Sequence, residues 1–449
     1  MSASDTTSVR ITDLDWRARG LVRLGGRLCR LPGVLPGEQV TLSLDEHPNI
    51  LAVDEVSADR VDAGCAQVAH CPGCQLRHAT SDFSFSWRSE RALQDLRSAG
   101  LKIPYVGHLL GQASRDGYRV RAVAHAMTTP DGELLLGMRG RRSSVELGRC
   151  PVQSPRCREL IDALERDLRS LGLRAYDSQT RTGELRHVVI DAPVDCGEGV
   201  PQSPPNYPRS RVTLCFGRPI ELEPLADSVL VEVDDVAVVA DILPFRSPSL
   251  FARPTQLRGG AAIDMRVGSD WLRASLPAWT PQTPETVPVV KQSILSWLGD
   301  LEQQRVLEVG CGVGTNSLAI ARIADLLVGV DSSRSAILDA TYNAGRAGLD
   351  NCEFRVGEAE KALARVLAKH RTFDAVVLHA MRRPFGARAM AAVGQMNPSR
   401  VIYLGPSPRS IAEDLSHLRS YEITELGFID QSPGTTGLLT LCALTPTEA

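Results

Sequence analysis

Alternating apolar and polar positions over the first part of the chain predict a series of short strands. Between residues 8 and 57, segments with this alternation are each bounded by Gly, Pro or Asp: SVRITDLD, GLVRLGGRLCRLPG, EQVTLSLDE and ILAVDEVS. Short strands separated by turn residues are typical of a small antiparallel barrel. We therefore expect an all-β barrel, OB-like in size, over residues 1–57.

The pattern becomes mixed after residue 57. A stretch with several cysteines, residues 58–80, precedes the helical segment SFSWRSERALQDLRSAGL. Strand-like segments (GYRVRAVAHAM, LLLGMRG, LRHVVIDA) then accompany the helix-like PRCRELIDALERDLRSLGL. This mixture predicts a central α+β domain over residues 58–270.

Strand and helix patterns alternate in the last part of the chain. Apolar strand patterns such as RVLEVG, LLVGVD and FDAVVLHA are separated by helical patterns such as RSAILDATYNAGRAG and EKALARVLAK. This βαβ alternation is typical of a doubly wound parallel sheet with helices on both faces. We expect a Rossmann-like α/β domain over residues 271–449, which makes the protein multidomain.

Composition narrows the class of protein. The 449 residues are 43% hydrophobic and 23% charged, with a net charge of −3, as in a soluble globular protein. This balance excludes an overall basic tail for nucleic acid but leaves a local basic face possible. We find no apolar run of transmembrane length and no signal peptide, so we expect a cytoplasmic protein without membrane contact. The eleven cysteines are then thiols or metal ligands.

One glycine-rich loop carries a candidate ligand site. In VLEVGCGVGTNSLAIA, an apolar strand leads through three glycines into a helix, and Asp331 ends the next strand. Glycines allow a ligand close to the backbone, and a carboxylate about 20 residues on suits ribose hydroxyls. Because LE precedes the first glycine, S-adenosylmethionine is favoured over a nicotinamide cofactor, whereas a plain tight turn is the alternative. The predicted cofactor-binding residues are Glu308, Gly310, Gly312, Gly314, Asp331 and Glu358.

Four cysteines form a candidate metal site. Cys65, Cys71 and Cys74 are spaced C-x5-C-x2-C, and Cys150 lies downstream in LGRCPV. Four thiolates hold either a 4Fe-4S cluster or a tetrahedral zinc ion. The second C-x2-C pair of a zinc ribbon is missing, which favours the cluster. Unrelated buried cysteines remain the alternative.

These segments, in this order, resemble the bacterial uracil carbon-5 RNA methyltransferases that carry an N-terminal TRAM barrel and a 4Fe-4S cluster. ITDLDWRARGLVRLGGRLCRLPGVLPGEQV is similar to the TRAM domain, and CAQVAHCPGC with LGMRGRRSSVELGRCPV matches the cluster ligands. The resemblance makes Cys150 the fourth ligand. It also identifies VLEVGCGVGTNSLAIA as the donor-binding loop of a class I methyltransferase.

The resemblance fails at the catalytic residues. In the family, a cysteine adds to carbon 6 of uracil and a glutamate later removes the carbon-5 proton. The matching positions hold Pro406, in YLGPSPRSIAEDL, and Leu439, in PGTTGLLTLCAL. His379 stands in the family's Asp-Pro motif and is a candidate base, although a structural histidine is an equally good interpretation. Uracil carbon-5 chemistry is therefore doubtful for this chain.

Arginines provide the candidate contacts to RNA. They cluster in the expected barrel and in the strand YRVRAVAHAM, which resembles a strand that lines the family's RNA groove, and phosphate contact would suit them. The RNA-binding candidates are Arg17, Arg19, Arg23, Arg27, Arg119 and Arg121. A solvated basic face is the alternative for the barrel arginines. We expect a monomer that methylates structured rRNA or tRNA, or else a catalytically silent relative that binds RNA and keeps the S-adenosylmethionine and iron–sulfur sites. A donor-binding regulatory protein is a third possibility.

Overall fold

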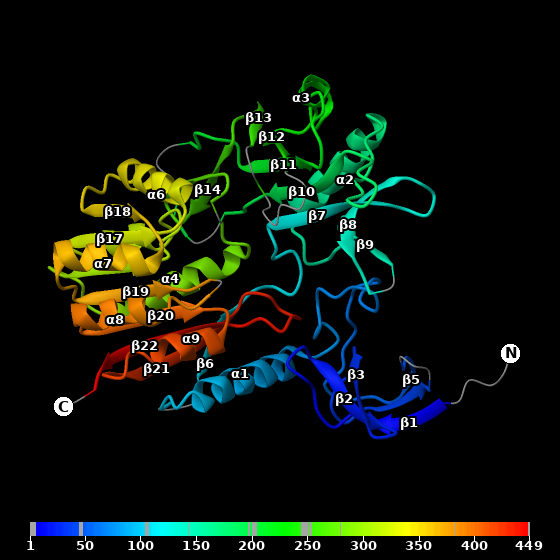
Figure 1. Cartoon of the computed structure of the whole chain (residues 1–449), viewed down its shortest axis with the longest axis horizontal. Helices are drawn as coiled ribbons and strands as arrows, with labels where there is room; N and C mark the ends of the chain where they lie inside the picture. The colour runs from blue at the N-terminus through cyan, green and yellow to red at the C-terminus, as the bar shows by residue number, and fades with distance from the viewer. Residues whose placement is uncertain are drawn as a thin grey trace.

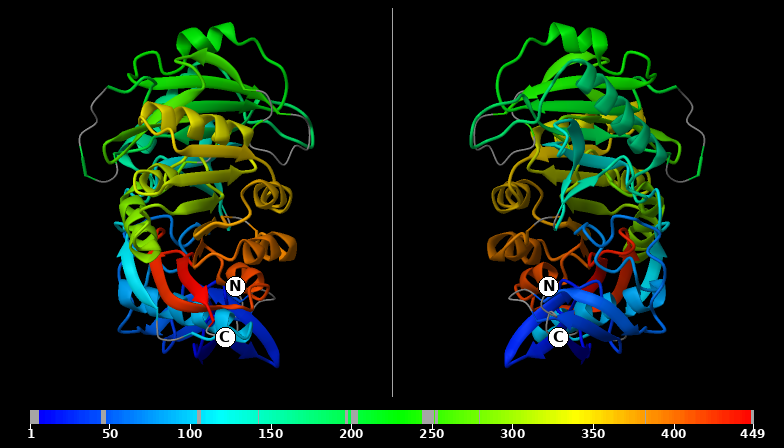
Figure 2. Two further views of the ribbon diagram at one scale, coloured as in Figure 1. Left: turned by 90° about the vertical axis from the view of Figure 1, so that its left-hand side faces the viewer. Right: turned by 90° about the vertical axis from the view of Figure 1, so that its right-hand side faces the viewer.

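The chain folds into two large sheets and a small β-rich unit (Figure 1). The computed structural model describes residues 6–44, 48–103, 107–141, 143–195, 198–199, 204–243, 251, 254–278, 280–381 and 383–447. Figure 2 shows the N-terminal strands at one end, the central sheet at the other and the C-terminal sheet between them. In this described part, no helix has the length and apolar character needed to cross a membrane.

The N-terminal unit consists of five short strands around one apolar core. Strands β1 (Thr6–Arg10), β4 (Gln39–Ser43) and β5 (Ile50–Glu55) form an antiparallel sheet, and β2 (Arg19–Leu24) pairs with β3 (Arg27–Pro32). The core contains Ile11, Val22, Leu31, Val34, Val40 and Leu42. At Gly20 the packing is so close that an added Cβ would lie 2.4 Å from Val34 Cγ2. The expected short strands are confirmed, whereas the TRAM assignment stays a prediction.

A seven-stranded sheet forms the centre of the expected α+β region. Its strand order is β13-β12-β11-β10-β7-β8-β9. The strands are β7 (Arg121–Thr128), β8 (Leu134–Arg139), β9 (Ser144–Glu146), β10 (Leu185–Asp191), β11 (Ser210–Phe216), β12 (Val236–Ile242) and β13 (Thr255–Arg258). Helix α2 (Pro155–Ser170) is capped by Ser154 and packs Leu160, Leu164 and Leu168 into the core on the sheet. Their spacing of four residues places them on one side of the helix, where each buried Leu contributes about 1.5–3 kcal/mol. The short helix α3 (Glu223–Ser228) adds Leu225 to this core.

The C-terminal sheet has eight strands in the order β18-β17-β16-β19-β20-β22-β21-β6. The strands are β6 (His108–Gln112), β16 (Arg305–Val309), β17 (Leu326–Asp331), β18 (Cys352–Val356), β19 (Ala375–His379), β20 (Arg400–Gly405), β21 (Tyr421–Asp430) and β22 (Leu439–Pro446). The first five strands of that order are parallel, and β22 is antiparallel to both of its neighbours.

Helices cover both faces of the C-terminal sheet. One apolar core includes residues from α7 (Ala359–His370), α8 (Ala387–Met396) and α9 (Pro408–Leu415). The other includes residues from α4 (Val287–Leu298), which follows the short 3-10 helix η1 (Pro284–Thr286), and from α5 (Ser317–Ala321). Helix α6 (Arg334–Arg346) follows β17. The Rossmann-like α/β fold expected from the alternating pattern is thus confirmed.

Two elements from the expected central domain pack in the C-terminal unit instead. Strand β6 extends the C-terminal sheet by pairing with β21 in parallel. Helix α1 (Ser81–Ser98) packs against α9 and places Leu93 and Leu96 in the core of that sheet. The division at residues 57 and 270 stays a prediction about autonomous domains, but the packing of α1 and β6 crosses it.

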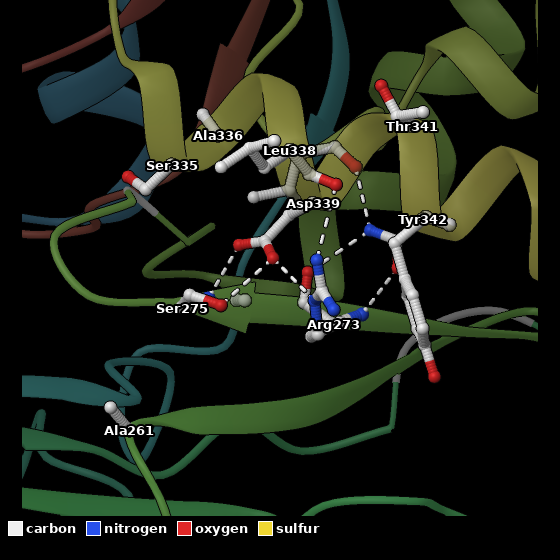
Figure 3. A network of polar contacts seen from close by, with 12 residues as sticks. Ala261, Arg273, Ser275, Ser335, Ala336, Leu338, Asp339, Thr341 and Tyr342 are labelled. Carbon is white, nitrogen blue, oxygen red and sulfur yellow. Dashed lines mark hydrogen bonds and ion pairs between the residues drawn. The ribbon is translucent and has the colours of Figure 1, made fainter. Parts of the chain in front are cut away.

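A hairpin at the expected boundary joins the central region to the C-terminal sheet. Strands β14 (Ala262–Val267) and β15 (Asp270–Ser275) form this hairpin, and β15 packs against α6. Figure 3 shows Arg273 and Ser275 converging on Asp339 of α6. Arg273 Nε lies 2.6 Å from Asp339 Oδ1, and its guanidinium lies 3.9 Å from the centre of the Tyr342 ring. These contacts fix the hairpin on the helix that follows β17.

Candidate functional site

The glycine loop, residues 310–314, connects β16 to α5 and requires its glycines. Gly310, Gly312 and Gly314 all have positive φ, of 82°, 56° and 90°. A Cβ at Gly310 would lie 2.4 Å from the carbonyl oxygen of His379. The Gly310 N–H donates to Val330 O at 2.7 Å, which holds the loop against the end of β17. The loop therefore packs between the carboxyl ends of β17 and β19, where side chains other than glycine are excluded or strained.

Asp331 ends β17 and lies directly beside the glycine loop. Its Oδ2 accepts the N–H of Gly312 at 3.0 Å, and its Oδ1 accepts the N–H of Ser333 at 2.8 Å. Strand order reverses between β16 and β19, and ligands of such sheets bind outside the carboxyl ends of the strands at this point. The structure thus brings the predicted glycines and the predicted acid together at the expected position.

Glu308 lies inside this site and not at its surface. The carboxylate is fully buried and accepts a hydrogen bond from the Ser317 hydroxyl at the start of α5. Burial raises the pKa of Glu308 to about 7, against the effect of hydrogen bonds from Ser317 and Asn316 and with a smaller increase from the charge of Asp331. Its hydrogen bond with Ser317 connects β16 to α5. A direct contact between Glu308 and the methyl donor stays a prediction.

Glu358 is exposed at the same edge of the sheet. It is the first residue before α7, directly after the turn that follows β18. The N–H of Gly357 donates to Asp331 O at 2.9 Å, which brings this turn beside the acid at the end of β17. Its predicted role in cofactor binding therefore stays open.

His379 is half-buried at the end of β19, next to the glycine loop. Burial lowers its pKa to about 4. The imidazole is therefore neutral near pH 7, and its basicity is low for a group that must remove a proton. His379 stays a candidate catalytic residue on position, with a pKa that favours hydrogen bonding over general-base catalysis.

Pro406 and Leu439 are neighbours at the ends of β20 and β22. Gly405 of β20 pairs with Thr440 of β22, and the next step of this register places Pro406 opposite Leu439. Pro406 is exposed, whereas Leu439 is 3% exposed within an apolar core. The two sequence positions that resemble the family's nucleophile and base thus meet in space without a thiol or a carboxylate.

Two other thiols near this part of the sheet are poor nucleophiles. Cys311 lies in the glycine loop, and Cys442 lies in β22 beside Tyr403 of β20. Both are buried. Burial raises the pKa of Cys442 to about 12 and that of Cys311 well above its usual value. Because the thiolate is the reactive form, neither replaces the missing cysteine.

The four predicted metal ligands are near enough to one another for their charges to affect thiol pKa values. Burial, with smaller contributions from the nearby Cys150 and Cys71, raises the pKa of Cys74 to about 12. Burial followed by the charges of Cys150 and Cys65 likewise raises the pKa of Cys71, against a hydrogen bond from the Gly73 N–H to its Sγ at 3.3 Å. Four cysteine thiols would be a suitable donor set for a metal cluster. Among the described residues, however, no three His, Cys, Asp or Glu side chains are close enough together to hold a metal ion.

A glutamine fixes the cysteine segment to the strand before Cys150. Gln67 Nε2 donates to Glu146 O at 2.9 Å, and Gln67 Oε1 accepts the Glu146 N–H at 2.7 Å. Glu146 is the last residue of β9, four residues before Cys150. This pair of bonds joins two segments that are more than 70 residues apart in the chain and holds the cysteine segment beside the strand that precedes Cys150. Patterns within the sequence do not indicate this contact.

The predicted RNA-binding arginines of the N-terminal unit differ in their exposure to solvent and in their partners. Arg23 and Arg27 are exposed, and Arg17 is exposed with its guanidinium 4.3 Å from the ring centre of Trp16. Arg19 forms an ion pair with Asp15 at 2.6 Å. The N-terminal unit therefore presents arginines and one exposed tryptophan on its surface, a combination suited to phosphates and stacked bases.

The two predicted arginines of the central region are partly or fully buried. Arg121 is 7% exposed, and its Nε lies 3.4 Å from Asp191 Oδ1. Arg119 is half-buried and donates from Nε to Arg121 O at 3.0 Å. Arg121 consequently has a structural partner inside the sheet, so we do not include it in the RNA surface proposed below.

Asn343 supports the glycine loop, and Asp339 supports the hairpin beside it. Neither residue was predicted from the sequence. Asn343 Nδ2 donates to Val313 O at 2.9 Å, inside the loop, and to Arg273 O at 3.1 Å. Asp339 holds the same strand, β15, by accepting the N–H of Ser275 at 2.6 Å (Figure 3). The segment YNAGRAGLDN contains Asn343, one helical turn after Asp339, but one of its partners, Arg273, lies 70 residues earlier in the chain.

Comparisons with known proteins agree with this geometry. Residues 300–414 match the family model described as a methyltransferase domain. An uncharacterised RNA methyltransferase of Halalkalibacterium halodurans is 26% identical over 99% of this chain and 98% of its own length. One from Parasynechococcus marenigrum is 27% identical over 96% and 94%.

A solved structure shares the whole fold. The tRNA (uracil-54, C5)-methyltransferase of Pyrococcus abyssi, solved with S-adenosyl-L-homocysteine, superposes with a TM-score of 0.75 at 18% identity, over 98% of this chain and 100% of that one. The chain is thus similar over nearly its full length to proteins named RNA methyltransferases, its residues 300–414 match a methyltransferase domain, and it shares its fold with a solved tRNA methyltransferase.

Proposed function

We propose that the protein is an S-adenosylmethionine-dependent methyltransferase of structured RNA, rRNA or tRNA, that works without a covalent cysteine adduct. One observation carries this proposal. The donor side of the site, Gly310 to Gly314 with Asp331, has the required geometry, while the position after β20 holds Pro406.

The donor side has groups suited to a nucleoside. Each oxygen of Asp331 accepts one backbone N–H and keeps acceptor capacity for a ribose hydroxyl. Glu308 and Asn343 hold α5 and the glycine loop in place without occupying the loop's outer surface. When bound, S-adenosylmethionine supplies an electrophilic methyl group. The residues of this chain bind and orient it.

The acceptor side favours an atom with its own lone pair. Carbon 5 of uracil needs a thiolate to make it nucleophilic, and neither Pro406 nor Leu439 provides one. A nitrogen or oxygen atom of RNA needs no such activation. His379, at the end of β19, is neutral near pH 7 and would act here as a hydrogen-bonding group.

We further propose that Cys65, Cys71, Cys74 and Cys150 hold a 4Fe-4S cluster. The mutual effect of these thiols on their pKa values and the link through Gln67 support a common site. Protein purified without air should contain about four irons per chain. Cys74→Ser should abolish the iron absorbance, whereas Cys29→Ser, in β3, should not. Stoichiometric zinc without iron would contradict the cluster.

The N-terminal unit is our proposed RNA-binding surface, in the manner of a TRAM barrel. Arg17, Arg23 and Arg27 are exposed there, and Trp16 offers an aromatic face. Binding should weaken with salt, because arginine–phosphate contacts release counterions. A monomer in the cytoplasm fits this proposal, and the oligomeric state can be measured by light scattering.

A second candidate function is the binding of RNA and S-adenosylmethionine without methyl transfer, as in a catalytically silent relative of the methyltransferases. The buried Leu439 and the proline at 406 favour it, since both catalytic positions of the family are lost together. A tritium-transfer assay from labelled donor into RNA of a deletion strain separates the two. Transfer by wild type but not by Asp331→Ala supports the enzyme. Donor binding by calorimetry without any transfer supports the silent relative.

A further inference from the structure

A cavity of about 220 Å³ lies on another part of the molecule, where four segments meet. These are the cysteine segment, the start of α1, the loop between β6 and β7, and the turn between β21 and β22, which approaches the N-terminal end of α1 in Figure 1. The lining residues that carry the argument are Arg77, Ser81, Ser84, Arg88, Arg115 and Asp430. None of these residues belongs to the candidate donor site, and none is a predicted metal ligand.

Among the residues that line the cavity, arginines outnumber acids, while the carboxylate of Asp59, outside the lining, accepts the Thr80 hydroxyl at 3.2 Å. Arg88 and Asp430 neutralise each other through two contacts, of 2.8 and 2.6 Å. Arg77 pairs with Asp116, whose carboxylate lies outside the lining. In the described part of the chain, Arg115 donates only to carbonyl oxygens and forms no ion pair. The three arginines therefore exceed the acids that balance them by one charge.

Two buried donors in the lining have no hydrogen-bond partner among the described residues. They are Ser84 Oγ and Arg77 Nε, on side chains of residues that are 3% and 2% exposed. An unpaired buried polar group of this kind costs about 1–3 kcal/mol, so such groups are rare without a ligand or water.

The N-terminus of α1 adds further donors at the same place. Thr80 caps the helix, and its side chain accepts the N–H of Phe83. Ser81, the first residue of this 18-residue helix, lines the cavity. N–H groups at a helix start lack partners within the helix and favour a negative ligand.

From these features together, we propose that the cavity binds a phosphoryl oxyanion. A tetrahedral phosphate offers acceptor oxygens to Ser84 Oγ, Arg77 Nε, Arg115 and the start of α1 at once. It would also join α1 and the cysteine segment to the turn before β22, which already accepts the Leu76 N–H at Gly434 O at 2.8 Å. The phosphate is either free inorganic phosphate or a phosphate of RNA. The proposal is independent of methyl transfer.

Calorimetry and thermal unfolding with inorganic phosphate, at ionic strength matched with potassium chloride, test the site. Wild-type protein should bind one phosphate per chain saturably and gain at least about 2 °C in Tm at saturation. Ser84→Ala should bind phosphate about tenfold more weakly, the loss expected for one hydrogen bond to a charged group. Its Tm without phosphate should be unchanged or higher, because the substitution removes an unpaired buried hydroxyl.

Arg115→Ala provides a second variant, with Arg97→Ala as its matched control. Arg115 is exposed enough to be replaced without unfolding the chain, and Arg97 is an exposed arginine near the other end of α1. Arg115→Ala should lower phosphate affinity at least about tenfold, and Arg97→Ala should leave it unchanged. Absence of saturable phosphate binding by wild type, or equal binding by all variants, would overturn the proposal. Competition between phosphate and RNA would identify RNA as the source, and simultaneous binding would identify free phosphate.

Discussion

Two regions along the carboxyl edge of the C-terminal sheet, called here the donor edge and the acceptor edge, differ in the functional side chains that they carry. At the donor edge, formed by the ends of β16 and β17, glycines with positive φ and a correctly placed carboxylate lie together. At the acceptor edge, formed by the ends of β20 and β22, a proline and a buried leucine occupy the corresponding places. The fold requires only that the side chains at both edges pack well. Methylation of uracil carbon 5 also requires a thiol and a carboxylate at the acceptor edge. Binding and catalysis can therefore diverge within one sheet.

The largest expected effect is that of Gly310→Ala at the donor edge. The new Cβ would lie 2.4 Å from His379 O, and φ of 82° is unfavourable for alanine. Clash and strain together should destabilise the C-terminal unit by about 3 kcal/mol and abolish donor binding. Gly312→Ala is the matched control, because its Cβ would meet nothing within 4 Å. It should cost only about 1–2 kcal/mol of backbone strain, measured by urea unfolding. Equal losses would show that the close approach to β19 is not decisive.

The pH dependence of stability should separate Glu308 from His379. The folded-state pKa of Glu308 is raised from 4.5 to about 7, so its contribution to stability decreases as pH rises from about 4.5 to 7. That of His379 is lowered from 6.5 to about 4, so its contribution increases as pH rises from about 4 to 6.5. Each corresponds to about 3 kcal/mol at most, less for the half-buried histidine.

The two variants that test these signs are Glu308→Gln and His379→Asn. Relative to wild type, Glu308→Gln should gain stability on going from pH 5 to 8, and His379→Asn should lose stability on going from pH 4 to 6.5. Thermal unfolding across this range is the measurement. The same sign for both variants would contradict the assigned pKa directions.

A smaller effect is expected from Asp331→Ala. The change leaves two ribose hydroxyls and the Gly312 N–H without their acceptor. Donor affinity should fall by about 1–3 kcal/mol, roughly 5- to 150-fold, as measured by calorimetry. Asp325→Ala, which replaces an exposed acid just before β17, should leave affinity unchanged. If both variants bind the donor as wild type does, Asp331 does not contact the donor.

The smallest effect is expected at the acceptor edge. Wild type should form no denaturation-stable adduct with 5-fluorouridine RNA, because that trap requires a thiolate at carbon 6. Pro406→Cys should recover little or no turnover, since Leu439 accepts no proton and members of a catalytic unit fail together. Denaturing gels with labelled RNA measure both. A wild-type adduct would mean that another cysteine is the nucleophile.

Local pattern predicted the alternating strands and helices of the C-terminal sheet because each element is specified by its own periodicity. Partners far away in sequence were not predictable in this way. Strand β6 pairs with β21, and α1 packs on α9, although more than 300 residues separate each pair. The apolar faces of β6 and α1 indicate that both elements are buried, but they do not indicate which elements cover them.

The candidate site shows the same limit. Gly310 and Asp331 were predicted because a local turn and a strand end determine their conformation. Arg121 was predicted to contact RNA, but period-two alternation does not tell which face of a strand is buried, and this face holds Asp191. The support from Asn343 and the link through Gln67 depend on tertiary contacts that single-sequence patterns do not contain.

Nucleoside mass spectrometry tests the central claim most directly. Total RNA from a strain lacking the protein would be incubated with S-adenosylmethionine and either wild type or Asp331→Ala, then digested and compared. We predict a methylated nucleoside other than 5-methyluridine that appears with wild type and is reduced with Asp331→Ala. Formation of 5-methyluridine, or of no methylated nucleoside at all, would contradict the account.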